Sequence, residues 1–294
     1  MASRRFEGST TSDSTNKGQK AERLDALLGM EWFPDYFAYA PGALALRECV
    51  RLAAMQGIEL PEPILDVGCG DGIFARLCYP DRQVWGIDIN PTEIRRAQST
   101  AAYSTLICGN IVTCDLPKSY FRSAIANCSL EHVPDLHGAL RTIHQALVQG
   151  APFVLIVPTP TWTQELVVPK LLEGLGLSTL ARTYRDALDR VFFHVHLYDA
   201  PKWRSILEEA GFEVESVKGI VSKGVTAAFD LLLYPSAIGW LIKQLTGRWT
   251  LLPGLRRGLA PLFWALIHAT VARFEESDPS RDHAGEFVIC ARKR

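Results

Sequence analysis

The sequence predicts an α/β fold in which helices cover both faces of a mostly parallel sheet. Strand-like and helix-like segments alternate along residues 58–160, as they do in chains that build such a sheet. Residues 153–157 form an unbroken apolar run, which is typical of a strand buried on both faces. The chain has 294 residues, of which 48% are hydrophobic, enough to bury one full core, so we expect a single domain over residues 21–294.

The expected elements follow one another in a regular order. Residues 21–57 are predicted to form an N-terminal helical cap rich in aromatic side chains. Strands are predicted over residues 63–67, 83–88, 105–108, 123–128, 153–157, 212–218 and 286–292, and helices over 72–78, 91–101 and 136–148. A further helix is expected to begin at Asp199, with Pro201 in its first turn, and to end at Ala210, because Gly211 suits a left-handed C-cap.

The turn after the first predicted strand contains Gly68, Gly70 and Gly72. Alternate glycines let the backbone lie directly against a ligand while the chain passes from strand into helix. The spacing is Gly-x-Gly-x-Gly, whereas a dinucleotide-binding turn needs Gly-x-Gly-x-x-Gly, and Ile73 occupies the third glycine position of that pattern. A nicotinamide-dependent dehydrogenase is therefore disfavoured.

Two acidic residues accompany this turn. Asp66 stands two residues before Gly68, where a carboxylate would repel a pyrophosphate but suits a ligand that carries an ammonium group and a sulfonium. Asp88 ends the second predicted strand, at the place where nucleotide-binding α/β folds have the acid that accepts ribose hydroxyls. Together the turn and the two acids predict S-adenosylmethionine as the ligand.

Three further segments complete a resemblance to a known family. They are Asn90-Pro-Thr-Glu93, Ile107-Cys-Gly-Asn110 and Ala126-Asn-Cys-Ser-Leu-Glu-His-Val-Pro-Asp135. With the glycine turn, the chain resembles the class I S-adenosylmethionine-dependent methyltransferases, and within them the ubiquinone, sterol and natural-product group known as methyltransferase type 11. The resemblance covers residues 60–160 continuously and 194–218 more loosely. It implies a Rossmann-like seven-stranded sheet, mostly parallel with the last strand antiparallel. The family normally joins the sixth and seventh strands closely, so the helical insertion that we expect before the last strand departs from the family.

The resemblance also implies which residues hold the cofactor. Asp66 is expected on the methionyl ammonium side, in direct contact or through water, and Asp88 on the ribose hydroxyls with Ile89 against the adenine. The family usually has an aspartate where this chain has Asn110, whose amide oxygen can still accept a hydrogen bond from the adenine. Asn127 is expected to border the sulfonium and the methyl group; the alternative is that it only caps the strand end. The full predicted set is Asp66, Gly68, Cys69, Gly70, Gly72, Asp88, Ile89, Asn110, Ile111 and Asn127.

Methyl transfer needs alignment and exclusion of water, and it needs a base only where the acceptor is a hydroxyl or a protonated amine. His132, His194 and His196 are the candidate bases, because they stand near the expected methyl or substrate position and can titrate near neutrality. The alternative role for His132 is positioning of the cofactor. His194 and His196 are expected to share one face of a short strand. No metal is expected, since no carboxylate or cysteine stands at obvious ligand spacing from them.

Composition excludes several other classes. The net charge of -1 gives no electrostatic footprint for nucleic acid. Seven cysteines without a Cys-x-x-Cys pair are typical of free thiols in a reducing compartment, and the first residues lack the apolar segment of a signal peptide. We therefore expect a cytoplasmic protein. Residues 1–20 are polar and are expected to form a disordered tail.

An apolar, basic insertion is expected at residues 219–284, before the last strand. Residues 219–273 contain six basic side chains against Asp230 alone, a net charge of +5. None of its apolar stretches is expected to reach the roughly eighteen residues that span a bilayer. Three interpretations remain: a peripheral membrane contact through 219–273, a lid over the substrate, or extra helices that only pack against the domain.

We therefore expect methyl transfer to oxygen or nitrogen, less readily to carbon, of a lipophilic small metabolite or natural product in secondary metabolism. The cofactor-binding core is placed at residues 58–160, and a substrate-side segment at 161–198. One alternative is a cofactor-binding protein of this fold without turnover. Another is a membrane-associated methyltransferase of lipids or isoprenoid quinones. A nucleic-acid amino methyltransferase is disfavoured, because Asn127 is followed by Cys-Ser-Leu and not by two prolines and an aromatic residue.

Overall fold

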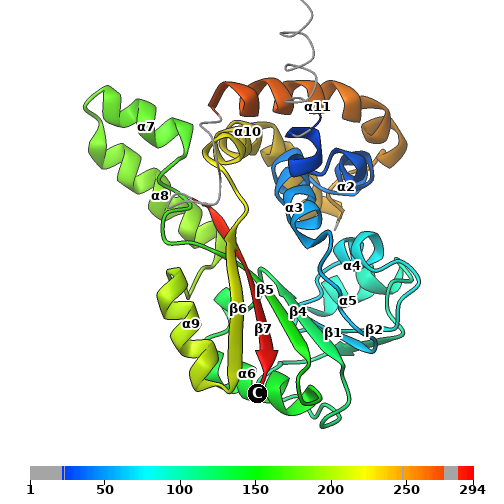
Figure 1. Ribbon diagram of the computed structural model, residues 1–294. Coiled ribbons are helices and arrows are strands. Elements are labelled where there is room, and N and C mark those ends of the chain that lie inside the picture. Colours follow the sequence, from blue (N-terminus) through cyan, green and yellow to red (C-terminus); the bar gives the residue numbers. More distant parts are fainter. Residues whose placement is uncertain (1–21, 23, 247, 275–283) are drawn as a thin grey trace, which may run out of the picture.

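The computed structural model describes residues 22, 24–246, 248–274 and 284–294. The predicted disordered tail, 1–20, lies outside the described residues. A seven-stranded sheet with the order β3-β2-β1-β4-β5-β7-β6 forms the centre of the molecule (Figure 1). Strand β7 is antiparallel to both of its neighbours, and the other described pairs are parallel. The predicted α/β sheet with an antiparallel last strand is confirmed.

The strands have nearly the predicted bounds. They are β1 (Ile64–Val67), β2 (Val84–Asp88), β3 (Thr105–Cys108), β4 (Ser123–Asn127), β5 (Pro152–Pro158), β6 (Phe212–Gly219) and β7 (Glu286–Lys293). Side chains that alternate along a strand enter different apolar clusters: Ile64 joins a cluster with α2 (Phe33–Tyr39) and α3 (Gly42–Met55), whereas Leu65 joins one with α6 (Leu136–Ala146) and α9 (Ala200–Glu209). Both faces of the sheet are therefore buried, as expected for parallel strands.

Three helices begin at the capping residues that the sequence contains. Asn90 Oδ1 accepts a hydrogen bond from Thr92 N at 2.9 Å at the start of α5 (Pro91–Gln98). Asp135 caps α6 and Asp199 caps α9 in the same way, through main-chain N–H groups three residues later. These caps fix where the chain turns back after each strand. The remaining helix of this core, α4 (Ile73–Cys78), follows the glycine turn directly.

The substrate-side segment differs from its prediction. It contains a helical pair, α7 (Val167–Gly174) and α8 (Ser178–Phe192), and the short strand expected around His194 and His196 is wrong, because these residues lie in a loop. Val195 N and His196 N both donate to the carbonyl oxygen of Glu131, at 2.9 and 3.0 Å. The loop is thus held by one carbonyl of the short helix η2 (Leu130–His132) and not by a strand ladder.

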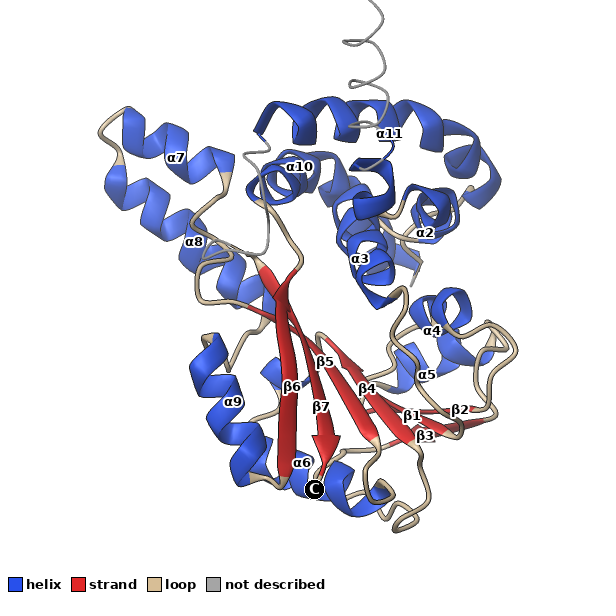
Figure 2. Cartoon of the chain, in the orientation of Figure 1, coloured by secondary structure: helices blue, strands red, loops and turns tan. Residues whose placement is uncertain are grey.

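The insertion forms two long helices, α10 (Lys223–Thr246) and α11 (Pro253–Phe274), which gather with α2 and α3 in the upper part of the view in Figure 2. Side chains on the inner face of α11 attach it to the N-terminal helices. Trp264 packs against Phe33 and donates through Nε1 to Asp25 at 3.0 Å. Arg256 donates to the carbonyl oxygens of Phe37 and Ala40 at 2.9 and 2.7 Å. Part of the insertion's positive charge therefore serves tertiary structure.

The prediction that no apolar stretch of the insertion is long enough to span a bilayer is wrong for α10. This helix continues through Asp230 and Pro235, and by length and composition it is the one helix among the described residues that could cross a bilayer. Its first half, however, belongs to the core of the domain. Asp230 is fully buried and accepts hydrogen bonds from Tyr184 Oη at 2.5 Å and Val168 N at 2.8 Å. These two donors satisfy the carboxylate, so the acid can be buried within the helix.

Candidate active site

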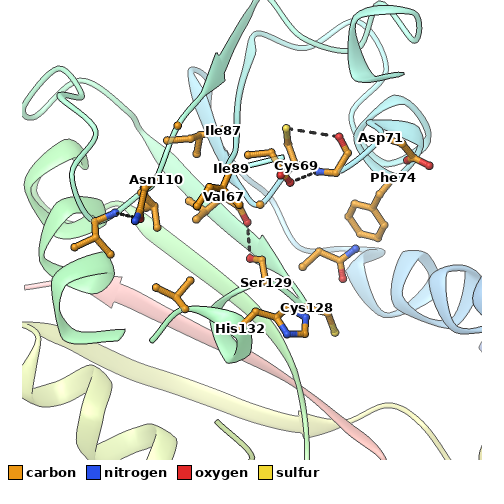
Figure 3. Close-up of a pocket in the computed structure, with 18 of the residues that line it drawn as sticks. Val67, Cys69, Asp71, Phe74, Ile87, Ile89, Asn110, Cys128, Ser129 and His132 are labelled. Atoms are coloured by element: carbon orange, nitrogen blue, oxygen red, sulfur yellow. Dashed lines mark hydrogen bonds between the residues drawn. The ribbon is translucent and has the colours of Figure 1, made fainter. Parts of the chain in front are cut away.

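A cavity of about 590 Å³ lies at the carboxyl edge of the parallel strands, a volume typical of small-molecule sites. Figure 3 shows Asn110 and Phe74 on opposite sides of it, with His132 and Ser129 below. Of the predicted residues, those that line it are Gly68, Cys69, Gly70, Asp88, Ile89, Asn110, Ile111, Asn127 and His132. The order of the strands explains this result, because Val67, Asp88 and Asn127 end three neighbouring strands at one edge.

The three glycines of the turn have three different functions. Gly70 has φ 54° and lines the cavity, and a Cβ atom added to it would meet nothing within 4 Å. Gly68 has φ 74°, and its added Cβ would lie 2.2 Å from the Cβ of Ser129, so it permits a close approach of two loops. Gly72 precedes α4 with φ 79° and packs near Tyr103, outside the cavity. Only Gly68 and Gly70 therefore present backbone to a ligand.

Asp88 is held rigidly at the edge of the cavity. Its Oδ2 accepts from Gly70 N at 3.0 Å, and its Oδ1 accepts from Asn90 N at 2.8 Å. Ile89, the next residue, is 69% exposed and lines the same cavity. An exposed apolar side chain beside a fixed carboxylate suits a flat base next to a polar sugar. On the far wall, Asn110 Oδ1 accepts from Val112 N at 2.9 Å.

Asp66 lies beneath the turn and not in the cavity. It is buried, its Oδ2 accepts from Tyr103 Oη at 2.7 Å, and burial raises its pKa to about 7. Another acid of the same turn, Asp71, does line the cavity. Burial raises the pKa of Asp71 to about 6, and its Oδ1 accepts from Ile73 N at 3.1 Å. The signal in the sequence was its position between Gly70 and Gly72.

Helices α2 and α3 add residues that sequence reasoning missed. Glu48, on α3, lines the cavity, and its Oε2 accepts from Asn127 Nδ2 at 3.0 Å and from Tyr36 Oη at 3.5 Å. The other amide atom, Asn127 Oδ1, is buried and has no hydrogen-bond partner among the described residues. A buried acceptor without a donor is costly, so this atom points to a bound ligand. The signal in the sequence was an acid between Arg47 and Arg51 on an otherwise apolar helix.

A second cavity of about 170 Å³ adjoins the first and shares three of its lining residues, Glu48, Cys128 and His132. Cys128 has φ 46°, a strained conformation for a residue other than glycine, and it stands between the two cavities. The rest of the lining consists of four arginine and glutamate side chains, one histidine and three apolar residues. These are Arg47, Arg51, Glu131 and Glu286, then His194, and finally Leu44, Pro158 and Phe192. No described residue of α10 or α11 lines either cavity.

Buried charges in the second cavity compensate one another. Glu286 on β7 forms ion pairs with Arg47 and Arg51 of α3, and it is fully buried. Burial raises the pKa of Glu286, but the two guanidinium groups outweigh that effect and lower the pKa to about 2. Arg51 also binds Glu48 through Nη1 at 2.5 Å. These pairs fix the side of α3 that faces both cavities.

His132 lines both cavities, and its two ring nitrogens have different surroundings. Its Nδ1 lies 3.0 Å from the carbonyl oxygen of Phe193, which can only accept, so Nδ1 carries the hydrogen and Nε2 is left bare. Nε2 lies 3.6 Å from Oε1 of Glu131. Burial raises the pKa of Glu131 to about 8, so this carboxyl is largely neutral at pH 7.

The other two histidines are placed differently. His194 stacks on His132, with ring centroids 5.7 Å apart, and lines only the second cavity. Burial lowers the pKa of His194, and its Nδ1 lies 3.4 Å from Asp189 Oδ1. His196 lies outside both cavities, because its two ring nitrogens bind Tyr198 Oη and the carbonyl oxygen of Val133, each at 2.9 Å. Within the described part of the chain, no group of three or more histidine, cysteine and acidic residues could hold a metal ion.

Comparison with known proteins decides the family. Residues 36–217, more than half of the chain, match the profile of the family described as methyltransferase domain. The chain belongs to this family. An uncharacterised methyltransferase of Mycobacterium tuberculosis (strain H37Rv) is 31% identical over 115 residues, which are 38% of this chain and 54% of that protein. The chain thus spans about half the length of the mycobacterial relatives it matches.

Two more distant proteins are also similar to this methyltransferase. The 27-O-demethylrifamycin SV methyltransferase of Amycolatopsis mediterranei is 26% identical over 216 residues, 68% of this chain and 73% of that protein. The crystal structure of a S-adenosylmethionine-dependent methyltransferase from Thermotoga maritima superposes with a TM-score of 0.53 at 14% identity, over 86% of this chain and 91% of the other. The latter likeness concerns the fold alone.

The family match and the sheet order confirm the predicted class I methyltransferase fold, with S-adenosylmethionine as cofactor. The residues present fit that cofactor on three observations: the open space at Gly70, the carboxylate of Asp88 at the cavity wall, and the unpartnered Oδ1 of Asn127. Asp88 would hold the ribose hydroxyls, Ile89 would lie against the adenine, and Asn127 with Glu48 would border the methionyl end.

Proposed function

We propose that the protein transfers the methyl group of S-adenosylmethionine to an ionisable oxygen or nitrogen of a small acceptor, with His132 as the base. The observation that carries this proposal is the position of His132 in the wall shared by both cavities, with its Nε2 bare. When bound, the cofactor supplies a methyl group already activated on a sulfonium. His132 accepts the proton that the acceptor loses, and Phe193 stabilises the resulting imidazolium through its carbonyl oxygen.

The second cavity supports a polar reacting group on the acceptor. With a volume of about 170 Å³ it admits only the reacting end of a molecule. Arg47, Glu48 and Glu131 offer hydrogen bonds to a hydroxyl or an amine, and they offer nothing to an alkene carbon. Leu44, Pro158 and Phe192 provide the apolar contacts of the same cavity and favour apolar atoms next to the reacting group. The similarity to a rifamycin O-methyltransferase agrees with O-methylation of a natural product.

The test is incubation of the protein with methyl-labelled S-adenosylmethionine and extracts of its source organism, followed by identification of the labelled product. We expect the label on oxygen or nitrogen of a small, mainly apolar compound, and we expect its loss with the His132→Ala variant. Saturable cofactor binding without any labelled product would contradict methyl transfer and would support a cofactor-binding protein. A label on carbon would contradict the role of His132 in deprotonating a hydroxyl or an amine.

A further inference from the structure

The outer side of α11 carries a continuous row of exposed leucines. Leu252, just before the helix, is followed by Leu255, Leu259, Leu262 and Leu266, and each of the five is 40 to 69% exposed. Spacings of three and four residues place the four leucines within α11 on one face of the helix, and Leu252 continues the same spacing just before it. We call these five residues the leucine face. Figure 1 shows α11 on the outside of the molecule, where such a face meets the surroundings.

The leucine face is not needed to hold α11 on the domain. The opposite side of the helix carries Ala260, Trp264, Ile267 and Val271, all buried. That side packs on the N-terminal helices, and it already accounts for the helix as part of the fold. Five leucines in one row on the other side form an apolar patch of a kind that soluble monomers seldom leave uncovered. The patch therefore requires an occupant.

The charges around the leucine face indicate what the occupant is. Residues 231–274 contain no aspartate or glutamate, and their charged residues are Lys243, Arg248, Arg256, Arg257 and Arg273. Arg273 stands seven residues after Leu266, two helical turns further on the same face, and is exposed. Arg248 is exposed just before the other end. An apolar row with a cation at each end matches a surface that is apolar inside and anionic at its boundary.

We propose that α11 lies in the interface of a bilayer containing anionic lipid, with the leucine face in the acyl region and Arg248 and Arg273 at the headgroups. A second copy of the chain fits less well, because a symmetric contact would bring together two segments whose charges are all positive. A spanning arrangement fits less well too, because Trp264 anchors the inner side of α11 to Asp25 and Phe33. This inference stands apart from the proposed chemistry.

Vesicle flotation tests the proposal with the full chain. We expect binding to vesicles of phosphatidylcholine mixed with phosphatidylglycerol, and much weaker binding to phosphatidylcholine alone. Binding to the mixed vesicles should weaken as salt rises but should not vanish, since only the charge contribution is screened. Arg248→Gln with Arg273→Gln should lower the affinity about thirtyfold at low salt, because two cations near an anionic surface contribute about 1 kcal/mol each. Leu255→Glu with Leu262→Glu should lower it at least about tenfold at every salt concentration.

A matched control adds the same two charges elsewhere. His137→Glu with Gln145→Glu changes two exposed residues of α6, at the other end of the molecule in Figure 1, and should leave vesicle binding unchanged. Circular dichroism and cofactor affinity show that each variant is folded, independently of methyl transfer. Absence of binding by the wild type, or equal losses in the α6 and leucine-face variants, would overturn the proposal. The proposal would also be overturned if the wild type were a dimer that the double variant Leu255→Glu with Leu262→Glu dissociates, and neither protein bound vesicles.

Discussion

Arg51 of α3 and Glu286 of β7 are joined by two parallel hydrogen bonds, Nε to Oε2 at 2.8 Å and Nη2 to Oε1 at 2.5 Å, across 235 positions of the chain. Paired bonds of this kind between a guanidinium and a carboxylate fix both direction and distance. The pair connects the N-terminal cap to the sheet at the floor of the second cavity. It is therefore a determinant of both stability and the shape of the site.

Glu286→Gln should destabilise the protein strongly. The variant leaves Arg47 and Arg51 buried opposite a neutral amide, and breaking a buried pair costs about 3–5 kcal/mol of unfolding free energy. Urea denaturation at pH 7 measures the loss. Glu215→Gln is the control, because Glu215 pairs with Arg292 on the neighbouring strand at the surface, where a pair contributes at most about 1 kcal/mol. Equal losses in the two variants would contradict the buried-pair account.

Gly70→Ala should weaken cofactor binding more than it weakens the fold. Gly150→Ala provides the comparison, since both glycines have positive φ, 54° and 73°, and an added Cβ meets nothing within 4 Å at either position. Each variant should lose about 1 kcal/mol of stability from backbone strain. Calorimetry should show a loss of S-adenosylmethionine affinity of about tenfold or more for Gly70→Ala alone, because only Gly70 lines the cavity. Unchanged affinity would remove Gly70 from the site.

His132→Ala should lower turnover about a hundredfold while cofactor affinity changes little, as expected when a general base is lost. For an acidic acceptor the loss should diminish at high pH, where the acceptor ionises without help. Measurement of kcat and of the cofactor Kd separates the two effects, with His137→Ala on the exposed side of α6 as the control. Parallel losses in binding and rate would instead indicate a positioning role.

Glu131 should make stability depend on pH in a defined direction. Its pKa is raised from 4.5 to about 8 in the folded state, so between these pH values the folded chain binds more protons than the unfolded chain. The unfolding free energy must then fall as pH rises through this window. In Glu131→Gln this decline should be smaller, and denaturation at pH 5, 7 and 9 measures it. A wild type and a variant with the same slope would show that Glu131 ionises normally.

The sequence predicted the sheet closely, because each strand is a short apolar segment bounded by turn residues and its period is independent of tertiary contacts. It also predicted residues such as Gly70 and Asp88, whose neighbours in space are close in the chain. Glu48 could not be predicted in the same way. It enters the site because α3 crosses the carboxyl edge of the sheet, and that docking depends on Glu286, far along the chain.

The positions of Asp66 and His196 also depend on partners that are distant in the chain or lie in loops. Asp66 lies within the first strand as expected, but the hydroxyl of Tyr103 donates to it beneath the turn, and no local sequence pattern predicts that partner. His196 satisfies both ring nitrogens within its own loop and against Val133, which removes it from the site. Spacing in the sequence predicts which region of the fold a residue occupies. The direction in which its side chain points depends on hydrogen-bond partners that are brought close only by folding.

The position of β7 in the sheet has a consequence for how the protein is made. This strand lies between β5 and β6, both of which leave the ribosome earlier. Until β7 emerges, β5 has one unpaired edge and β6 has two, and such edges invite association with other chains. Arg47 and Arg51 also lack their ion-pair partner Glu286 during this interval. The nascent chain should therefore depend on chaperones most just before β7 is synthesised, and a truncation that removes β7 should aggregate.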